Sequence, residues 1–298
     1  MLLSGNGIAV CAFLVWGLLP LYFQYIPNAN VLEILSIRVL FSIPCIYLLL
    51  KALRIPMGKI WAAMHNKKTV FLCFLAGMFN FMSLYSFTWA VTHEQVLAAS
   101  LGYFINPIFS IVFGVLFLKD RLSTFQSVAV ALSIAGIGCQ VYYYGELPWL
   151  SLIMGGAFAL YGLMKKFIRL DALSIMMIEL ITILPLALGF LFHDLWQQTS
   201  VFQSGDTPKI LLYLLSAPVT LIPLVLFSMA VERTNLIMIG FIQYIEPSIQ
   251  FLLAVIVFGE ALLQVKVMSF GLIWLGLLLC IIEMTFRKKR PPMQKALG

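Results

Sequence analysis

VLAASLGYFINPIFSIVFGVLFL, residues 96–118, contains no charged side chain and carries Pro107 about halfway along. A helix needs about 20 apolar residues to cross the ~30 Å hydrocarbon core of a bilayer. This stretch is long enough, and it lacks the alternation of apolar and polar residues that is typical of a barrel strand. It therefore predicts a membrane-spanning helix.

Nine further stretches have the same character. The chain of 298 residues is 62% hydrophobic and only 10% charged, against roughly 45–50% and about 25% in soluble domains. We therefore predict an all-α integral membrane protein with ten transmembrane helices, which leaves no room for a soluble catalytic or nucleotide-binding domain. Besides 96–118, the predicted spans are 6–26, 31–53, 69–91, 124–144, 148–166, 172–193, 209–231, 236–258 and 265–286.

The basic residues are distributed unevenly between the two sides of this arrangement. Most of the 19 lysines and arginines fall in connections on one side. The opposite side has only Lys209 and Lys266, and Arg38 lies within a span. Basic residues mark the cytoplasmic side, so both termini are expected in the cytoplasm. This topology accounts for the net charge of +7, and no nucleic-acid partner is expected.

Cysteine and histidine usage argues against a metal or cofactor site. The five cysteines all fall in predicted spans without paired spacing, and the three histidines lie far apart in sequence. Neither pattern is typical of a zinc site or a disulfide framework. We expect no metal and no cofactor.

An internal repeat divides the chain. A shift of 140 residues takes Asn106-Pro107 to Glu246-Pro247 and Gly136 to Gly276. We predict two repeats of five spans each, residues 1–145 and 146–298. Because five is odd, the second repeat enters the membrane from the opposite face. In transporters built this way, the substrate site lies near the bilayer midplane at interrupted helices in matching positions.

The spans 96–118 and 236–258 fit that description, since each carries a proline that removes a backbone donor about halfway along. One helical face of each span is polar. The faces are Ser100, Tyr103, Pro107 and Ser110 in the first span and Gly240, Gln243, Pro247 and Gln250 in the second. They line a cavity, or they form hydrogen bonds with neighbouring helices.

Ionisable side chains within the spans are further candidates, because a charge at the centre of the bilayer costs ~2.5–3.5 kcal/mol or more. Arg38 keeps its charge and must face an acidic partner, water or an anionic group of a substrate. Glu179, its counterpart in the second repeat, and Glu246 are candidate partners. Both carboxyls could carry protons or form structural ion pairs. Glu33 lies near a span end, where we expect it to reach the membrane surface.

The candidate residues form two sets, and none of them is expected to be catalytic. Trp16 and Tyr161 are expected to pack in the protein in preference to stacking on a substrate, and Asn80 faces either a cavity or another helix. The candidate substrate-binding residues are Arg38, Asn80, Ser100, Tyr103, Asn106, Gln243, Tyr244 and Glu246. The candidate gating or coupling residues are Trp16, Pro107, Tyr161, Glu179 and Pro247.

Small residues form a continuous surface on the spans 124–144 and 265–286. They are Ala131, Ala135, Gly136 and Gly138 in the first and Gly271 and Gly276 in the second. Small residues let helices approach closely, so these two spans pack as a scaffold or form a homodimer contact.

Several segments resemble the RarD group of the EamA branch of the drug/metabolite transporter superfamily, over essentially the whole chain. They include 99–107 (ASLGYFINP), 116–121 (LFLKDR), 240–247 (GFIQYIEP) and 258–260 (FGE), with Trp16-Gly17 and Arg38-Val39. The resemblance implies two inverted five-helix bundles, cytoplasmic termini, a bacterial inner membrane, and export or exchange of small solutes. Glu246 is not expected to be a carboxylate throughout that group, so its role rests on physical argument.

The leading hypothesis is a secondary transporter that works by alternating access. Without an ATP-binding loop of the G-x-x-x-x-G-K-[ST] type, the energy must come from gradients. One fixed cation and a nearby carboxylate suit an amino acid, another zwitterion or a drug as the small-molecule substrate. The alternatives are an intramembrane lipid-processing enzyme or a sensor, although the sequence has no H-E-x-x-H or G-x-S-x-G motif of the kind that supports intramembrane catalysis.

Overall fold

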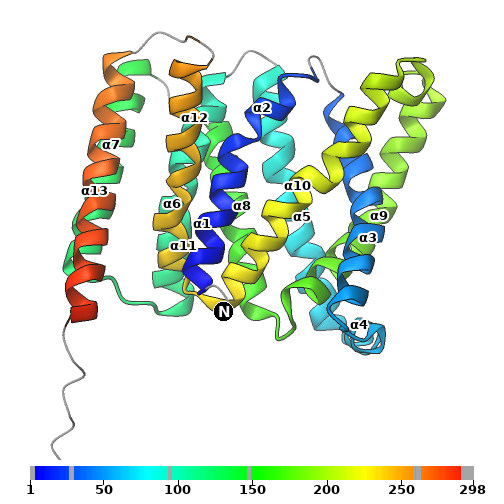
Figure 1. Cartoon of the computed structure of the whole chain (residues 1–298), viewed down its shortest axis with the longest axis horizontal. Helices are drawn as coiled ribbons and strands as arrows, with labels where there is room; N and C mark the ends of the chain where they lie inside the picture. Colours follow the sequence, from blue (N-terminus) through cyan, green and yellow to red (C-terminus); the bar gives the residue numbers. More distant parts are fainter. Residues whose placement is uncertain are drawn as a thin grey trace, which may run out of the picture. The chain divides into compact units, whose positions relative to one another are not determined.

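A computed structural model describes residues 4–26, 30–92, 96–145, 149–257, 259 and 263–289, and these residues form helices and their connections (Figure 1). The helices are α1 (Gly5–Leu18), α2 (Pro20–Phe23), α3 (Val31–Ala52), α4 (Met57–Met64), α5 (Lys67–Thr92), α6 (Val96–Leu118), α7 (Thr124–Tyr144), α8 (Trp149–Phe167), α9 (Ala172–Trp196), η1 (Val201–Gln203), α10 (Thr207–Arg233), α11 (Leu236–Gln243), α12 (Ile245–Ile256) and α13 (Gln264–Lys289).

Eight helical segments of the described chain are long and apolar enough to cross a membrane. Two more apolar helices, Gly102–Leu118 and Val267–Glu283, are shorter over the residues described. Each of these segments overlaps one of the predicted spans. The structure is therefore that of an all-helical, multi-pass membrane protein.

Local sequence signals explain where the helices begin and break. The side chains of Asn30 and Asp171 accept backbone hydrogen bonds at the starts of α3 and α9, and Ser123 forms a capping box with Gln126 at the start of α7. Such caps satisfy backbone donors that have no partner within the helix. The first predicted span divides into α1 and α2 directly before Pro20.

Helix packing divides the described chain into two compact units. The smaller unit contains α7 and α13, which lie side by side (Figure 1). A Cβ atom on Gly136 would lie 2.9 Å from the Ser269 carbonyl oxygen, and one on Gly276 would lie 3.1 Å from the Ala129 Cα. The Ser269 hydroxyl also donates to the Gly136 carbonyl at 2.6 Å. These small residues pack within the chain, as expected of a scaffold, and the homodimer contact stays a prediction.

The larger unit contains α1–α6 and α8–α12, and its packing has a regular pattern. α1 packs against α10, α11 and α12, whereas α8 packs against α5 and α6. α3 packs against α9 and α10, whereas α9 packs against α3 and α5. α6 packs against α11. In the predicted repeats, α1 corresponds to α8, α3 to α9, α5 to α10, and α6 to α11 and α12. When each helix in this list is replaced by its counterpart, the same set of packing pairs results.

At one end of this unit, polar contacts join connections that the sequence assigns to the cytoplasm. The Lys59 ammonium lies 2.7 Å from the Asp171 carboxylate, and the Thr234 hydroxyl donates to the Asn6 side chain at 2.5 Å. Burial raises the pKa of the Asp171 carboxyl, but hydrogen bonds from Lys59 and Ser174 outweigh this effect, and the pKa lies below its usual value. The basic connections within this unit thus share one end.

The opposite end is held by different contacts. Glu33 is 1% exposed, and its carboxylate accepts hydrogen bonds from the Ser200 hydroxyl at 2.6 Å and the Val201 backbone N–H at 2.8 Å. The Asn30 side chain donates to Asp194 at 3.0 Å. The expectation that Glu33 reaches the membrane surface is wrong, because its carboxylate satisfies the start of η1.

Candidate functional site

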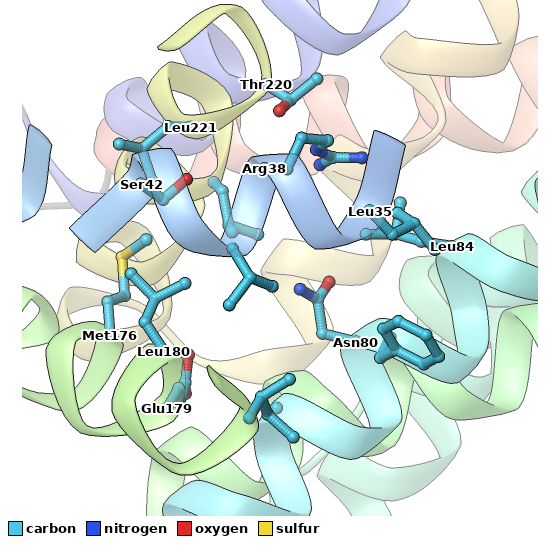
Figure 2. Close-up of a pocket in the computed structure, with 15 residues that line it drawn as sticks. Leu35, Arg38, Ser42, Asn80, Leu84, Met176, Glu179, Leu180, Thr220 and Leu221 are labelled. Carbon is cyan, nitrogen blue, oxygen red and sulfur yellow. The ribbon is translucent and has the colours of Figure 1, made fainter. Parts of the chain in front are cut away.

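A cavity lies in the larger unit between α3, α5, α9 and α10 (Figure 2). Its volume is about 60 Å³, which is room for a few water molecules at roughly 10–15 Å³ each. It is too small for a metabolite in this conformation. Its lining is mostly apolar, and the polar side chains are Arg38, Ser42, Asn80, Glu179 and Thr220.

Arg38 is the basic residue of this lining. It lies seven residues into α3, roughly 10 Å from the start of the helix at 1.5 Å per residue. Within the part of the chain that the structure describes, its guanidinium has no ion pair and no hydrogen bond, although it lies within electrostatic range of Tyr103. A half-buried cation without an acidic partner is a candidate binding site for an anionic group of a substrate.

Asn80 lies on α5 across the cavity from α3, and Figure 2 shows its amide directed toward that helix. Its Oδ1 atom is buried and has no hydrogen-bond partner among the described residues. Buried polar atoms are usually hydrogen-bonded. Asn80 therefore has an unsatisfied buried acceptor beside the cavity.

Glu179 lies at the other end of the cavity from Arg38 and Asn80 (Figure 2). Its carboxylate is paired with Lys165 of α8, whose Nζ lies 2.8 Å from Oε1 and 3.1 Å from Oε2. Both side chains are buried, with 2% of the Lys165 side chain and 8% of the Glu179 side chain exposed. The same Nζ lies 4.7 Å from the centre of the Tyr161 ring, within the range of a cation–π contact.

This pairing corrects two interpretations of the sequence. The sequence places Lys165 among the basic residues of the connections on one side, and the structure buries it. Arg38 was one candidate partner of Glu179, but Lys165 takes that place. The sequence contained one sign that Lys165 is directed into the protein. It follows Tyr161 by four residues and therefore lies on the same helical face.

The predicted residues on α6 and α12 form a second polar group. Gln250 donates to the Glu246 carboxylate at 3.4 Å. Tyr103 lies near the Gln250 side chain and within electrostatic range of both Glu246 and Arg38. Tyr103 is therefore close to both this group and Arg38, although the residues of this group do not line the cavity.

Two buried amides accompany this group. Oδ1 of Asn106 and both amide atoms of Gln243 lack hydrogen-bond partners among the described residues. Tyr244 is fully buried. None of the three lines the cavity, and the side chain of Ser100 lies outside the described residues.

The two predicted prolines affect their helices differently. α6 continues through Pro107, whereas a break at Tyr244 separates α11 from α12. Pro247 lacks the N–H that would bond the carbonyl four residues earlier. α6 and α11 meet closely, since a Cβ on Gly240 would lie 2.8 Å from the Pro107 carbonyl oxygen. The expected interruption is present in the second span only.

Trp16 and Tyr161 lie in a cluster of aromatic rings. The Trp16 ring centre is 5.6 Å from those of Phe158 and Phe227, and the Tyr161 ring stacks on Phe227 at 5.8 Å. These contacts favour packing over substrate stacking for both residues, and their gating role stays a prediction.

The chain is similar, along nearly its whole length, to proteins that are described as transporters. A model of the EamA-like transporter family matches residues 3–141. A Vibrio cholerae protein described as an uncharacterized transporter is 34% identical over 284 residues, 94% of this chain and 92% of that protein. The protein RarD of Escherichia coli is 34% identical over 287 residues, 96% of this chain and 97% of that protein.

A solved crystal structure has the same fold, with a TM-score of 0.72 and 16% identity over 94% of this chain and 97% of that one. The fold and the relatives together define a membrane protein of a transporter family. The chain belongs to the EamA-like transporters and, within them, to the RarD group.

Proposed function

We propose that this protein is a secondary transporter that moves small metabolites or drugs across a bacterial inner membrane, by export or exchange. The observation that carries the proposal is the cavity among α3, α5, α9 and α10, which places the unpaired Arg38 well inside a membrane-spanning helix. Intramembrane charges of this kind mark substrate or ion pathways.

The chain crosses the membrane ten times in this proposal, as two inverted repeats, residues 1–145 and 146–298. The exchange of packing partners in the larger unit supports the repeat. The family model supports it as well, because its match to residues 3–141 ends near the proposed boundary. The bias of basic connections supports cytoplasmic termini.

The contacts that hold the two ends of the larger unit support alternating access as the mechanism. Lys59–Asp171 joins the repeats at one end, and Glu33–Ser200 joins them at the other. Between them, the cavity has room only for water. A solute enters from one side when the contacts at that end open, and the inverted halves make the opposite opening equivalent.

The substrate site in this proposal contains Arg38 and Asn80 on the cavity wall. Tyr103, Gln243 and Glu246 belong to the predicted substrate-binding set but lie off the cavity wall, and Tyr103 lies within electrostatic range of Arg38. Ser100, Asn106 and Tyr244 complete the predicted set. Glu179, Trp16, Tyr161, Pro107 and Pro247 are proposed to act in gating or coupling.

Counterflow in proteoliposomes tests this function. Vesicles that contain the purified protein are loaded with a metabolite mixture, and exchange of labelled external solutes is followed. Exchange that depends on Arg38 supports the proposal, with Arg169→Gln as a control because Arg169 is an exposed basic residue. Chemical conversion of the solute would indicate an enzyme, and the absence of any exchange would contradict transport.

A further inference from the structure

The charges that face the cavity are unbalanced. Arg38 and Glu179 are the ionisable members of its described lining. Glu179 lies within 2.8 Å of Lys165, so its negative charge is already compensated. Arg38 has no such partner in the described chain. The cavity with its immediate surroundings therefore carries one positive charge in excess.

The remaining acidic candidate does not change this balance on the cavity wall. Glu246, on α12, accepts a hydrogen bond from Gln250 and does not line the cavity. Its ion pair with Arg38, which the sequence left open, is not present. Tyr103 lies within electrostatic range of both Glu246 and Arg38.

This arrangement distinguishes substrates by charge. A carboxylate can bind the planar guanidinium of Arg38 through two parallel hydrogen bonds. Among the described lining residues, the carboxylate that could face the ammonium of an amino acid is that of Glu179, which lies across the cavity from Arg38 and is held by Lys165. Placing a second cation beside Lys165 and Glu179 is unfavourable, because an ammonium that leaves water needs its own acidic partner.

The uncharged part of the lining indicates the rest of the substrate. Leu35, Val39 and Leu180 are among its aliphatic side chains, which favour an aliphatic body. The Oδ1 atom of Asn80 is buried and unpaired, so it can accept a hydrogen bond from a hydroxyl group. These features together describe a small hydroxy acid with an aliphatic chain.

We propose that the cavity, once it has expanded, selects small aliphatic organic anions, whose carboxylate binds Arg38, and that Lys165 disfavours zwitterions by compensating the charge of the Glu179 carboxylate. This inference rests on the transport function proposed above and specifies its substrate class. Lys165 is a specificity-determining residue here, and it acts through Glu179 without contacting the substrate.

Three probes with one carbon skeleton separate the charge classes. 2-Hydroxy-4-methylpentanoate is an anion, leucine carries an ammonium in place of the hydroxyl, and leucinol is a cation without the carboxylate. Binding to the purified full chain is measured by ligand-dependent thermal stabilisation in detergent. We expect the hydroxy acid to bind at least about 10-fold more tightly than leucine, and Arg38→Gln to weaken it roughly 10- to 100-fold, as expected for a lost charged hydrogen bond.

Two variants test the role of Lys165. Lys165→Met frees the Glu179 carboxylate, so leucine should gain relative to the hydroxy acid. The double variant Lys165→Met/Glu179→Gln has no free carboxylate, so leucine should not gain relative to the hydroxy acid in it. If the single variant does not fold, a gain of leucine in the double variant would overturn the role of Lys165.

Tighter binding of leucine than of the hydroxy acid, equal binding of all three probes, or binding of none would overturn the inference. An unchanged affinity in Arg38→Gln would do so as well. The transport proposal is tested separately by counterflow with an unselected metabolite mixture. A transporter that exchanges other solutes but ignores these probes would retain its function and lose the proposed selectivity.

Discussion

Replacing Lys165 with methionine would remove the cation of a buried ion pair while keeping a long side chain that favours helix. The Nζ atom lies 2.8 Å from the Glu179 carboxylate. At an effective dielectric constant of ~20, two unit charges at that separation attract by about 6 kcal/mol. Desolvation of the two ions opposes this by several kcal/mol each. The net contribution of the pair is therefore small.

The single and double variants should consequently behave differently. Lys165→Met leaves the Glu179 carboxylate buried without its cation, and such losses cost about 3–5 kcal/mol. Removing both charges in Lys165→Met/Glu179→Gln should be close to neutral. With roughly 2–4 °C of Tm per kcal/mol for a large domain, the single variant should melt about 6–20 °C below the original protein.

Thermal unfolding of the detergent-purified variants measures these differences, and the chain supplies a matched control. The Lys59–Asp171 pair has nearly the same separation, 2.7 Å, but the Lys59 side chain is 47% exposed. An exposed pair contributes about 0–1 kcal/mol, so Lys59→Met should shift Tm by only a few degrees. Equal shifts in Lys59→Met and Lys165→Met, or a double variant as unstable as the single, would refute the reasoning.

Arg38→Ala and Tyr103→Ala should abolish solute exchange in proteoliposomes while the protein still accumulates in the membrane; normal flux in both would remove these residues from the site. Gly240→Ala should destabilise the protein by roughly 1–3 kcal/mol through overpacking, because the added Cβ would lie 2.6 Å from Ile111 Cγ1. Gly138→Ala is the control, because its Cβ would have no atom within 4 Å, and it should leave Tm unchanged or higher. Because the folded pKa of Asp171 is lowered, its carboxylate stabilises the protein above about pH 4 and loses that effect as pH falls through the folded pKa. Asp171→Asn should flatten the acid limb of the Tm–pH profile, and an unchanged limb would contradict this.

The regular features of the fold were predictable because they depend on local chemistry. Long apolar stretches have no stable alternative to a helix in lipid, so each predicted span overlaps an apolar helix of the structure. The start of α9 at Asp171 follows from a capping side chain. The break at Tyr244 lies beside Pro247, where the sequence predicted an interruption, whereas α6 continues through Pro107, where the sequence predicted another.

The partners of the buried charges were not predictable, because they depend on side-chain geometry between helices. Lys165 stands near the end of its span, where lysines usually extend their charge to the membrane surface. The structure turns it inward against Glu179. Glu33 had the same ambiguous position, and it is buried because Ser200 and Val201 supply donors from a distant connection.

Composition and pattern alone determined that this chain is a helical membrane protein, and they identified Arg38, Asn80 and Glu179 as polar groups inside spans. The tertiary structure decided which of these groups are already satisfied. An ion pair forms only where two side chains from different helices come within about 4 Å, and sequence spacing does not encode that distance across a bundle. Packing of α8 against its neighbours brings Lys165 to Glu179 and leaves Arg38 as the cation that faces the cavity.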